Sequence, residues 1–257
     1  MNIKPLLLAL TISCAPMATY AKDWSQEPLA AVQQAAEQGD VDAQHNLGFM
    51  YAEGRGVARD DQQAVVWYRK AAEQGHLQAQ IFLGNMYVEG RGVAQDDKQA
   101  MFWIRKAADQ GAAYAQFLTG VMYSLGRGVA QDNQQALAWY RKAAKQGNAR
   151  AQHNLGVVYS AGLWGTEQDD KQAVVWYQKA AEQGDSVAQL HLASMYYEGR
   201  GVAQSNRQSY AWVLSAVAHG NTQAEHFRHL LLKELSPTDL VHAQQLAARY
   251  IQEYQPK

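Results

Sequence analysis

Residues Gly39 to Gly75 contain three segments that return along the chain: Asp40-Val-Asp-Ala-Gln-His-Asn-Leu-Gly48, Gly54-Arg-Gly-Val57 and Lys70-Ala-Ala-Glu-Gln-Gly75. The glycine that closes this stretch recurs at intervals of 36, 36, 36, 37 and 36 residues. Its positions are Gly39, Gly75, Gly111, Gly147, Gly184 and Gly220. Self-similarity at such a period is typical of helical solenoids, so the sequence predicts a stack of similar units.

The first half of the unit predicts a helix over Val41 to Glu53. Apolar or small residues fall at Ala43, Leu47, Met50 and Tyr51, which is the spacing of one buried helix face. A glycine on that face is unfavourable for a helix by roughly 1 kcal/mol relative to alanine, so its recurrence indicates close helix packing. The glycines concerned are Gly48, Gly84, Gly120 and Gly156, and Ala193 stands at this position in repeat five.

A second helix is predicted from Asp60 onward. Asp60 and Gln63 have the spacing of a capping box, with Asp in place of Ser or Thr. Trp67 and Tyr68 belong to the buried stripe of this helix, and Gly75 closes it. The capping pair returns as Asp96 with Gln99, Asp132 with Gln135, Asp169 with Gln172, and Ser205 with Gln208. The unit is therefore two helices, and stacking supplies the apolar surface that a single pair lacks.

These motifs resemble the Sel-one-like repeat, a relative of the tetratricopeptide repeats with a longer turn inside each hairpin. The resemblance covers about Ala36 to Gly220. It implies an all-α fold, an α-solenoid wound as a right-handed superhelix of helix-turn-helix repeats of about 36 residues. It also implies a scaffold for protein–protein contacts in bacterial envelopes or facing a host, and one cysteine-rich branch has been linked to β-lactams. Repeat three departs from the pattern at Thr119, repeat four lacks the Gly-Arg-Gly-Val turn, and repeat five has Val213 after its tryptophan.

The chain divides into four parts by this pattern. Residues 1–21 read as a signal peptide, and residues 22–39 as an N-terminal capping half-repeat. Residues 40–220 hold five repeats, and residues 221–257 hold a degenerate sixth repeat and a C-terminal capping helix. Atypical terminal units are what a solenoid needs to cover its last apolar faces.

The start of the chain predicts export. Lys4 precedes an apolar run, and Thr19 and Ala21 are small residues at the positions that a signal peptidase reads. We therefore expect cleavage after Ala21 and a periplasmic or secreted protein. Lipidation at Cys14, the only cysteine, is the less favoured alternative. The apolar run is too short for a spanning helix, and no later stretch predicts an integral membrane segment.

Composition disfavours several classes of function. The formal net charge is −1 and no segment is strongly basic, which disfavours nucleic acid or a phospholipid surface as the main partner. No serine has a lysine three residues on, and no cysteine remains after residue 21, so no catalytic residue and no cofactor is expected. His226 and His229 have a spacing that can share a metal, but nothing completes a ligand set, so no metal site is predicted.

A partner-binding groove is predicted instead. In tetratricopeptide-like repeats the first helix of each hairpin lines the concave side, and the corresponding positions here include many apolar residues. Exposed apolar strips mark binding surfaces. The predicted contact residues are His45, Phe49, Ile81, Asn85, Val88, Tyr114, Phe117, Val121, Leu125, His153, Leu190 and Tyr197. The alternative is that several of them pack against the first helix of the next repeat.

Trp164 lies in the irregular turn of repeat four and has two interpretations. It can tuck under its turn as Val93 or Val129 does elsewhere, or it can contact a partner, because aromatic residues are enriched at interface hot spots.

Three functions remain for such a chain. The favoured one is a monomeric, non-catalytic adaptor that holds a protein or peptide partner in its groove. The alternatives are an envelope enzyme related to the β-lactam-binding branch and a structural spacer in a larger assembly. The missing catalytic residues count against the enzyme. A groove with a distinctive chemistry would favour the adaptor over the spacer.

Overall fold

The computed structural model describes residues 23–255, which form one short 3-10 helix and thirteen α-helices without a β-strand. The predicted signal peptide and Cys14 lie outside this range. The elements are η1 (Trp24–Gln26), α1 (Leu29–Glu37), α2 (Val41–Glu53), α3 (Asp61–Glu73), α4 (Leu77–Glu89), α5 (Asp97–Asp109), α6 (Ala113–Leu125), α7 (Asn133–Lys145), α8 (Ala149–Ala161), α9 (Asp170–Ala181), α10 (Ser186–Glu198), α11 (Asn206–Ala218), α12 (Gln223–Leu231) and α13 (Pro237–Glu253).

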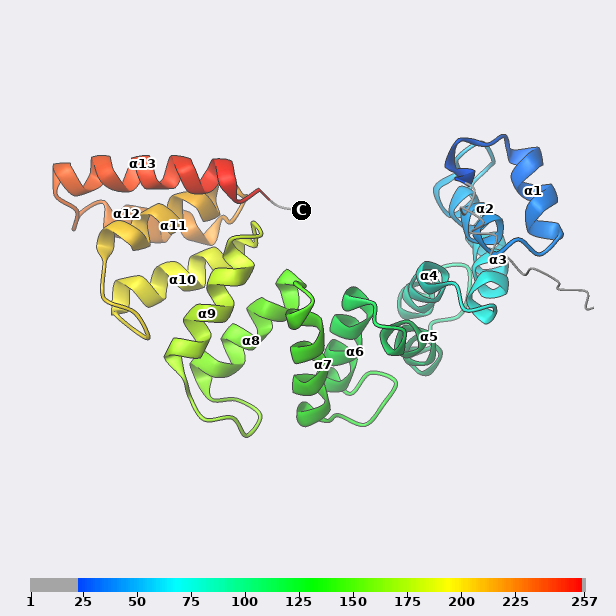
Figure 1. Ribbon diagram of the computed structural model, residues 1–257, viewed down its shortest axis with the longest axis horizontal. Helices are drawn as coiled ribbons and strands as arrows, with labels where there is room; N and C mark the ends of the chain where they lie inside the picture. The colour runs from blue at the N-terminus through cyan, green and yellow to red at the C-terminus, as the bar shows by residue number, and fades with distance from the viewer. Residues whose placement is uncertain (1–22, 256–257) are drawn as a thin grey trace, which may run out of the picture.

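The helices pair in chain order and the pairs stack along one open arc, with α1 near one end and α13 at the other (Figure 1). Repeat one is α2 with α3, repeat two α4 with α5, repeat three α6 with α7, repeat four α8 with α9, and repeat five α10 with α11. The all-α solenoid that the period predicted is confirmed. Among residues 23–255, no helix has both the length and the apolar character that crossing a membrane requires.

The second helix of each repeat begins at a side-chain cap, as predicted. The Asp60 carboxylate accepts hydrogen bonds from the backbone amides of Gln62 and Gln63 at 2.9 and 3.0 Å. The reciprocal half of a capping box is absent, because the amide of Asp60 donates to the carbonyl of Tyr51 instead. That bond joins the two helices of the hairpin, so the cap also fixes the long turn. The equivalent caps are Asp96, Asp132, Asp169 and Ser205.

The recurring glycine of the first helix is a close-packing site. A Cβ at Gly48 would lie 2.7 Å from Cδ1 of Tyr68, well inside van der Waals contact. Gly84, Gly120 and Gly156 face Ile104, Tyr140 and Tyr177 in the same way. Repeat five has Ala193 at the glycine position and Val213 at the tyrosine position, and both are fully buried. Ala193 adds a methyl group to the first helix, and Val213 is smaller than the tyrosine that it replaces on the second helix. The two departures from the pattern therefore compensate each other.

Buried glutamines connect successive repeats, which the sequence pattern did not lead us to expect. Gln80 donates from Nε2 to the carbonyl of Ala72 at 3.1 Å, and its Oε1 accepts from Gln110 at 2.7 Å. Since a buried amide without partners destabilises a fold, this double pairing fixes the register of neighbouring repeats. The same arrangement uses Gln44 with Gln74, Gln116 with Gln146, and Gln152 with Gln183.

The tryptophan of each second helix is covered differently at the C-terminal end of the stack. In repeat one the Lys70 ammonium lies 3.8 Å from the ring centre of Trp67, a cation–π contact that recurs in repeats two to four. In repeat five, Trp212 stacks instead against Tyr250 and Tyr254, which bring α13 across α11. The last tryptophan is therefore covered by an aromatic helix.

Candidate functional site: the first-helix face

The predicted contact residues lie on the first helices of the repeats, apart from Trp164 in the turn of repeat four. We call the exposed and half-buried side chains of α2, α4, α6, α8 and α10 the first-helix face. Tyr114 and Leu125 are exposed, at 40% and 62% of their surface. The half-buried members of the predicted set are His45, Phe49, Asn85, Val88, Val121, His153, Leu190, Tyr197 and Trp164.

Two predicted contact residues are not on the surface. Ile81 is 5% exposed and Phe117 is 8% exposed, so the prediction that they face water is wrong. Phe117 stacks on Tyr140 with ring centres 5.9 Å apart. In repeat three, the position two residues before Thr119 therefore faces the second helix of its own hairpin, which is a core direction.

One exposed aromatic residue of the first helices was missed by the prediction. Phe82 keeps 36% of its surface exposed and follows the buried Ile81 by one residue. Its ring stacks on Tyr68 at 5.3 Å and approaches His45 at 5.8 Å. The sequence held a signal, since an aromatic residue stands here on a helix whose core positions are already assigned.

Rings from three helices and one helix cap meet where repeat one joins repeat two, which we call the first junction. His45 of α2 stacks on His76 at 4.4 Å, and Tyr68 of α3 and Phe82 of α4 complete the cluster. Burial, and then the charge of His76, lower the pKa of His45 to about 4. Burial also raises the pKa of Tyr68 above its ordinary value. His45 is therefore neutral near pH 7, and its Nε2 has no hydrogen-bond partner among residues 23–255.

A cavity of about 190 Å³ opens beside this cluster, between α2 and α4. Its apolar wall includes Phe49, Phe82 and Met86, and the carboxylates of Glu53 and Glu89 stand at its rim. We call it the first-junction pocket. Its lining includes Phe49, a predicted contact residue, and Phe82, which the prediction missed.

Repeats three and four meet at the third junction, where the turn is built differently. Trp164 has a φ of 57°, the left-handed region that the matching Gly92, Gly128 and Gly201 occupy in other repeats. Its indole stacks on Tyr140 at 5.9 Å, so Tyr114, Phe117, Tyr140 and Trp164 form a chain of rings. Trp164 thus packs on the core of repeat three and remains half-buried.

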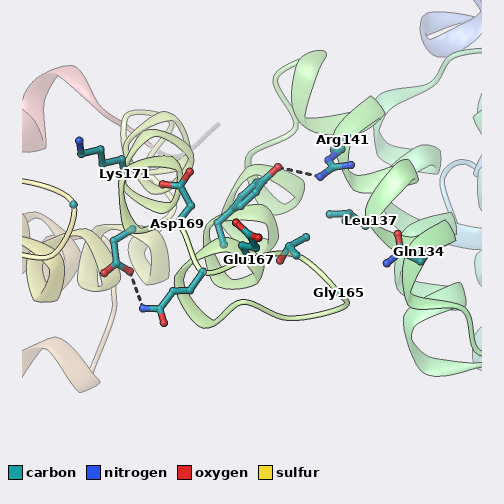
Figure 2. Close-up of a pocket in the computed structure, with 12 residues that line it drawn as sticks. Gln134, Leu137, Arg141, Gly165, Glu167, Asp169 and Lys171 are labelled. Atoms are coloured by element: carbon teal, nitrogen blue, oxygen red, sulfur yellow. Dashed lines mark hydrogen bonds between the residues drawn. The ribbon is translucent and has the colours of Figure 1, made fainter.

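A larger cavity of about 760 Å³ lies beyond this turn (Figure 2). Many of its polar side chains already have partners: Arg141 donates to the hydroxyl of Tyr159 at 3.1 Å, and Asp169 caps α9. Gln134 donates to the carbonyl of Trp164 at 2.5 Å. Lys171 points away from the centre of the cavity in Figure 2. We interpret this cavity as the space that the irregular turn leaves, since its polar groups serve the fold.

The histidines considered for a metal lie apart from these features. His226 and His229 are both exposed on α12. Across residues 23–255, no three His, Cys, Asp or Glu side chains come together in a way that could hold a metal ion. What the first-helix face offers chemically is aromatic and apolar surface with a few carboxylates beside it.

Comparison with known proteins agrees with the repeat register. The Sel1 repeat matches five times, over residues 41–76, 77–111, 113–148, 149–185 and 186–221. No curated protein sequence matched the chain. Proteins of the Sel1 repeat family generally act as scaffolds for protein–protein interaction.

Solved structures of similar repeats support the same assignment. A Sel1 repeat protein from Oxalobacter formigenes is 38% identical, with a TM-score of 0.72 over 81% of this chain and 59% of that one. The protective antigen c5321 of uropathogenic Escherichia coli, which displays an SLR fold, is 29% identical, with a TM-score of 0.51 over 88% and 64%. This chain therefore spans less than two thirds of either relative's length. It belongs to the Sel1 repeat family.

Proposed function

We propose that this chain is a non-catalytic scaffold that binds a protein or peptide partner on its first-helix face. The observation that carries the proposal is the set of apolar side chains left open to solvent there. Phe82, Tyr114, Leu125 and Val187 are all exposed on first helices of the repeats. Apolar surface gathered on one face of a protein is a mark of an interaction site. We further propose that this scaffold acts in the periplasm or outside the cell, because residues 1–21 read as a signal peptide.

A second apolar stripe exists on the second helices and has to be distinguished from the first. Val66, Phe102 and Val175 occupy the same position in repeats one, two and four, and each is nearly half exposed. Phe102, however, already contacts Lys106, whose ammonium lies 4.6 Å from the ring centre. We favour the first-helix face because it combines apolar surface with a cavity.

The test is capture of partners in the cell by crosslinking to the folded protein. Tyr114→Ala combined with Phe82→Ala should lower capture at least about tenfold, which corresponds to a loss of about 1.4 kcal/mol. Phe102→Ala is the matched control, because it removes an exposed aromatic ring from a second helix. Circular dichroism should show unchanged helix content in all variants.

The opposite result would place the interface on the second helices. If the double variant captures partners at full strength while Phe102→Ala loses them, the second-helix stripe is the binding surface. That result would favour the structural spacer over the groove-binding adaptor.

A further inference from the structure

Carboxylates outnumber cationic groups in the lining of the first-junction pocket. Glu53 and Glu89 are exposed at its rim, and the only cationic side chain lining it is Arg91. The Arg91 guanidinium is engaged by Asp61, with Nη2–Oδ1 at 2.8 Å and Nε–Oδ2 at 3.4 Å. Its distance to the Glu89 carboxylate is 3.7 Å, longer than a good hydrogen bond. A cationic group entering the pocket therefore meets carboxylates available to bind it.

The pocket also contains an unused hydroxyl. In repeat four, the Tyr177 hydroxyl lies 3.2 Å from the Ser160 hydroxyl. Repeat one has Ala52 at the serine position, and the Tyr68 hydroxyl makes no hydrogen bond to any residue in the range 23–255. Because Tyr68 lines the pocket, its hydroxyl is open to a ligand there, and a hydrogen bond to this hydroxyl adds to the affinity of that ligand.

The aromatic walls suit the same kind of ligand. The face of an aromatic ring attracts a cation, and the chain already uses this property when Arg55 stands 5.7 Å from the ring centre of Phe49. Phe82 and Met86 add apolar surface for a long aliphatic stem. A side chain with an apolar stem and a cationic head matches both parts of the pocket.

We propose that the first-junction pocket binds a lysine or arginine side chain of the partner polypeptide. This inference rests on the proposed scaffold function and specifies its partner as a segment with a basic residue among apolar ones. The cationic head binds the carboxylates of Glu53 and Glu89 and the hydroxyl of Tyr68. The apolar residues on one side of it continue toward Tyr114 along the first-helix face.

The other junctions are less suited to a basic side chain, which fixes where the partner's basic residue lies. At the third junction, Leu125 and Ala161 stand at the two positions that Glu53 and Glu89 hold at the first. The second junction has Ile104 at the tyrosine position. Only the first junction combines two glutamates with a tyrosine, so it sets the register of the bound segment.

The experiment selects ligands from a displayed library of random linear peptides, using the whole chain. The wild type should enrich peptides that have lysine or arginine beside apolar residues. Glu53→Gln combined with Glu89→Gln should lower affinity for an enriched peptide at least about tenfold. Changing the peptide's basic residue to norleucine should produce a similar loss. Glu37→Gln combined with Glu73→Gln is the charge-matched control and should bind like the wild type.

The outcomes separate this inference from the proposed function. Enriched peptides that lack a basic residue, or that bind the double glutamine variant at full strength, overturn the pocket while the groove stands. If no peptide is enriched, or if enriched peptides are insensitive to Tyr114→Ala, both the pocket and the groove function are overturned.

Discussion

The first and third junctions occupy the same place in their repeats but are closed by different side chains. At the first junction, Arg91 of the turn binds Asp61 on the preceding second helix. At the third, the corresponding residues are Leu163 and Asn133, and no ion pair forms between them. The two positions change together, and the Asn133 Oδ1 is buried without a hydrogen-bond partner among the described residues.

The difference extends to the backbone. Gly92 lies so close to α3 that a Cβ there would be 2.0 Å from the carbonyl oxygen of Asp61. Trp164 holds the matching left-handed position at the third junction, with an indole side chain where the other repeats have glycine. The turn of repeat four is one residue longer, and Gln134 of α7 reaches it with a side-chain hydrogen bond to the Trp164 carbonyl. One junction therefore has an ion pair and an open acidic pocket, and the other has an indole beside its tyrosine.

The largest expected effect tests the backbone contact. Gly92→Ala should lower the free energy of unfolding by at least about 4 kcal/mol, because it adds an overlap with the Asp61 carbonyl to an unfavourable φ. Gly165→Ala at the third junction should lower it by only about 1–2 kcal/mol, the cost of the left-handed conformation, since its Cβ meets the flexible Gln134 at 3.1 Å. Urea unfolding of both variants measures the difference.

Gly56→Ala is the control for the backbone conformation. Gly56 has a φ of 69°, close to that of Gly92, but its Cβ would meet only the end of Met50 at 3.4 Å. Equal losses in all three variants would contradict a tight first junction.

The repeat period predicted the helices, their caps and the glycine contacts because each of these depends on residues close together in the sequence. Val41 and Glu53 bound α2 as expected, and Gly48 packs on the second helix of its own hairpin. Exposure was harder to predict, since a residue on a first helix can face its own hairpin, the next repeat or solvent. Ile81 and Phe117 were assigned to solvent but are buried, and Phe117 packs on Tyr140 of its own hairpin.

The first-junction pocket could not be predicted from the period alone. Asp61 and Arg91 are thirty residues apart, and their pairing becomes visible only when positions are compared across a repeat boundary. The signal is present in the sequence, because Asn133 and Leu163 depart from the pattern together. The open Tyr68 hydroxyl depends on Ala52, a residue that is unremarkable until the hairpin is folded.

A moderate effect tests the histidine at the first junction. Phe117 stands at the third junction where His45 stands at the first, so of these two junctions the first alone should respond to acid at this position. Unfolded His45 takes up a proton near its ordinary pKa of about 6.5, whereas burial lowers its folded pKa to about 4. Between these values the unfolded state binds more protons, so stability falls as the pH falls from 6.5 to 4. This histidine should lower the free energy of unfolding by roughly 2 kcal/mol over that range.

The charged and titratable neighbours define the control for this experiment. His76 stacks on His45, Asp42 lies 3.3 Å from the Nε2 of His76, and Tyr68 is neutral. His45→Leu places here the residue that repeat five has as Leu190, and it should flatten part of the pH dependence of thermal unfolding. His229→Leu removes an exposed histidine from α12 and is the matched control variant. An unchanged slope in His45→Leu would assign the acid sensitivity elsewhere.

The smallest expected effect concerns the ion pair itself, and the second junction gives the simplest case. Asp97 accepts from Arg127 at 2.6 and 3.1 Å with no other arginine bound to it. Both side chains are about one-third exposed, so a double-mutant cycle with Asp97→Asn and Arg127→Leu should give a coupling of only about 1 kcal/mol. The coupling should shrink as salt is added, because the pair is partly solvated.

The reverse exchange at the third junction completes this comparison. Asn133→Asp combined with Leu163→Arg restores both charges, yet we expect almost no gain in the free energy of unfolding. In the first-junction pocket, Arg91 lies beside Tyr68, so the new arginine would have to lie beside Tyr140. Trp164 already occupies that place, because its indole stacks on Tyr140. A gain equal to the loss at the second junction would show that the ion pair alone distinguishes the junctions and that Trp164 leaves room for it. No gain would assign the difference to the indole and the extra residue of its turn.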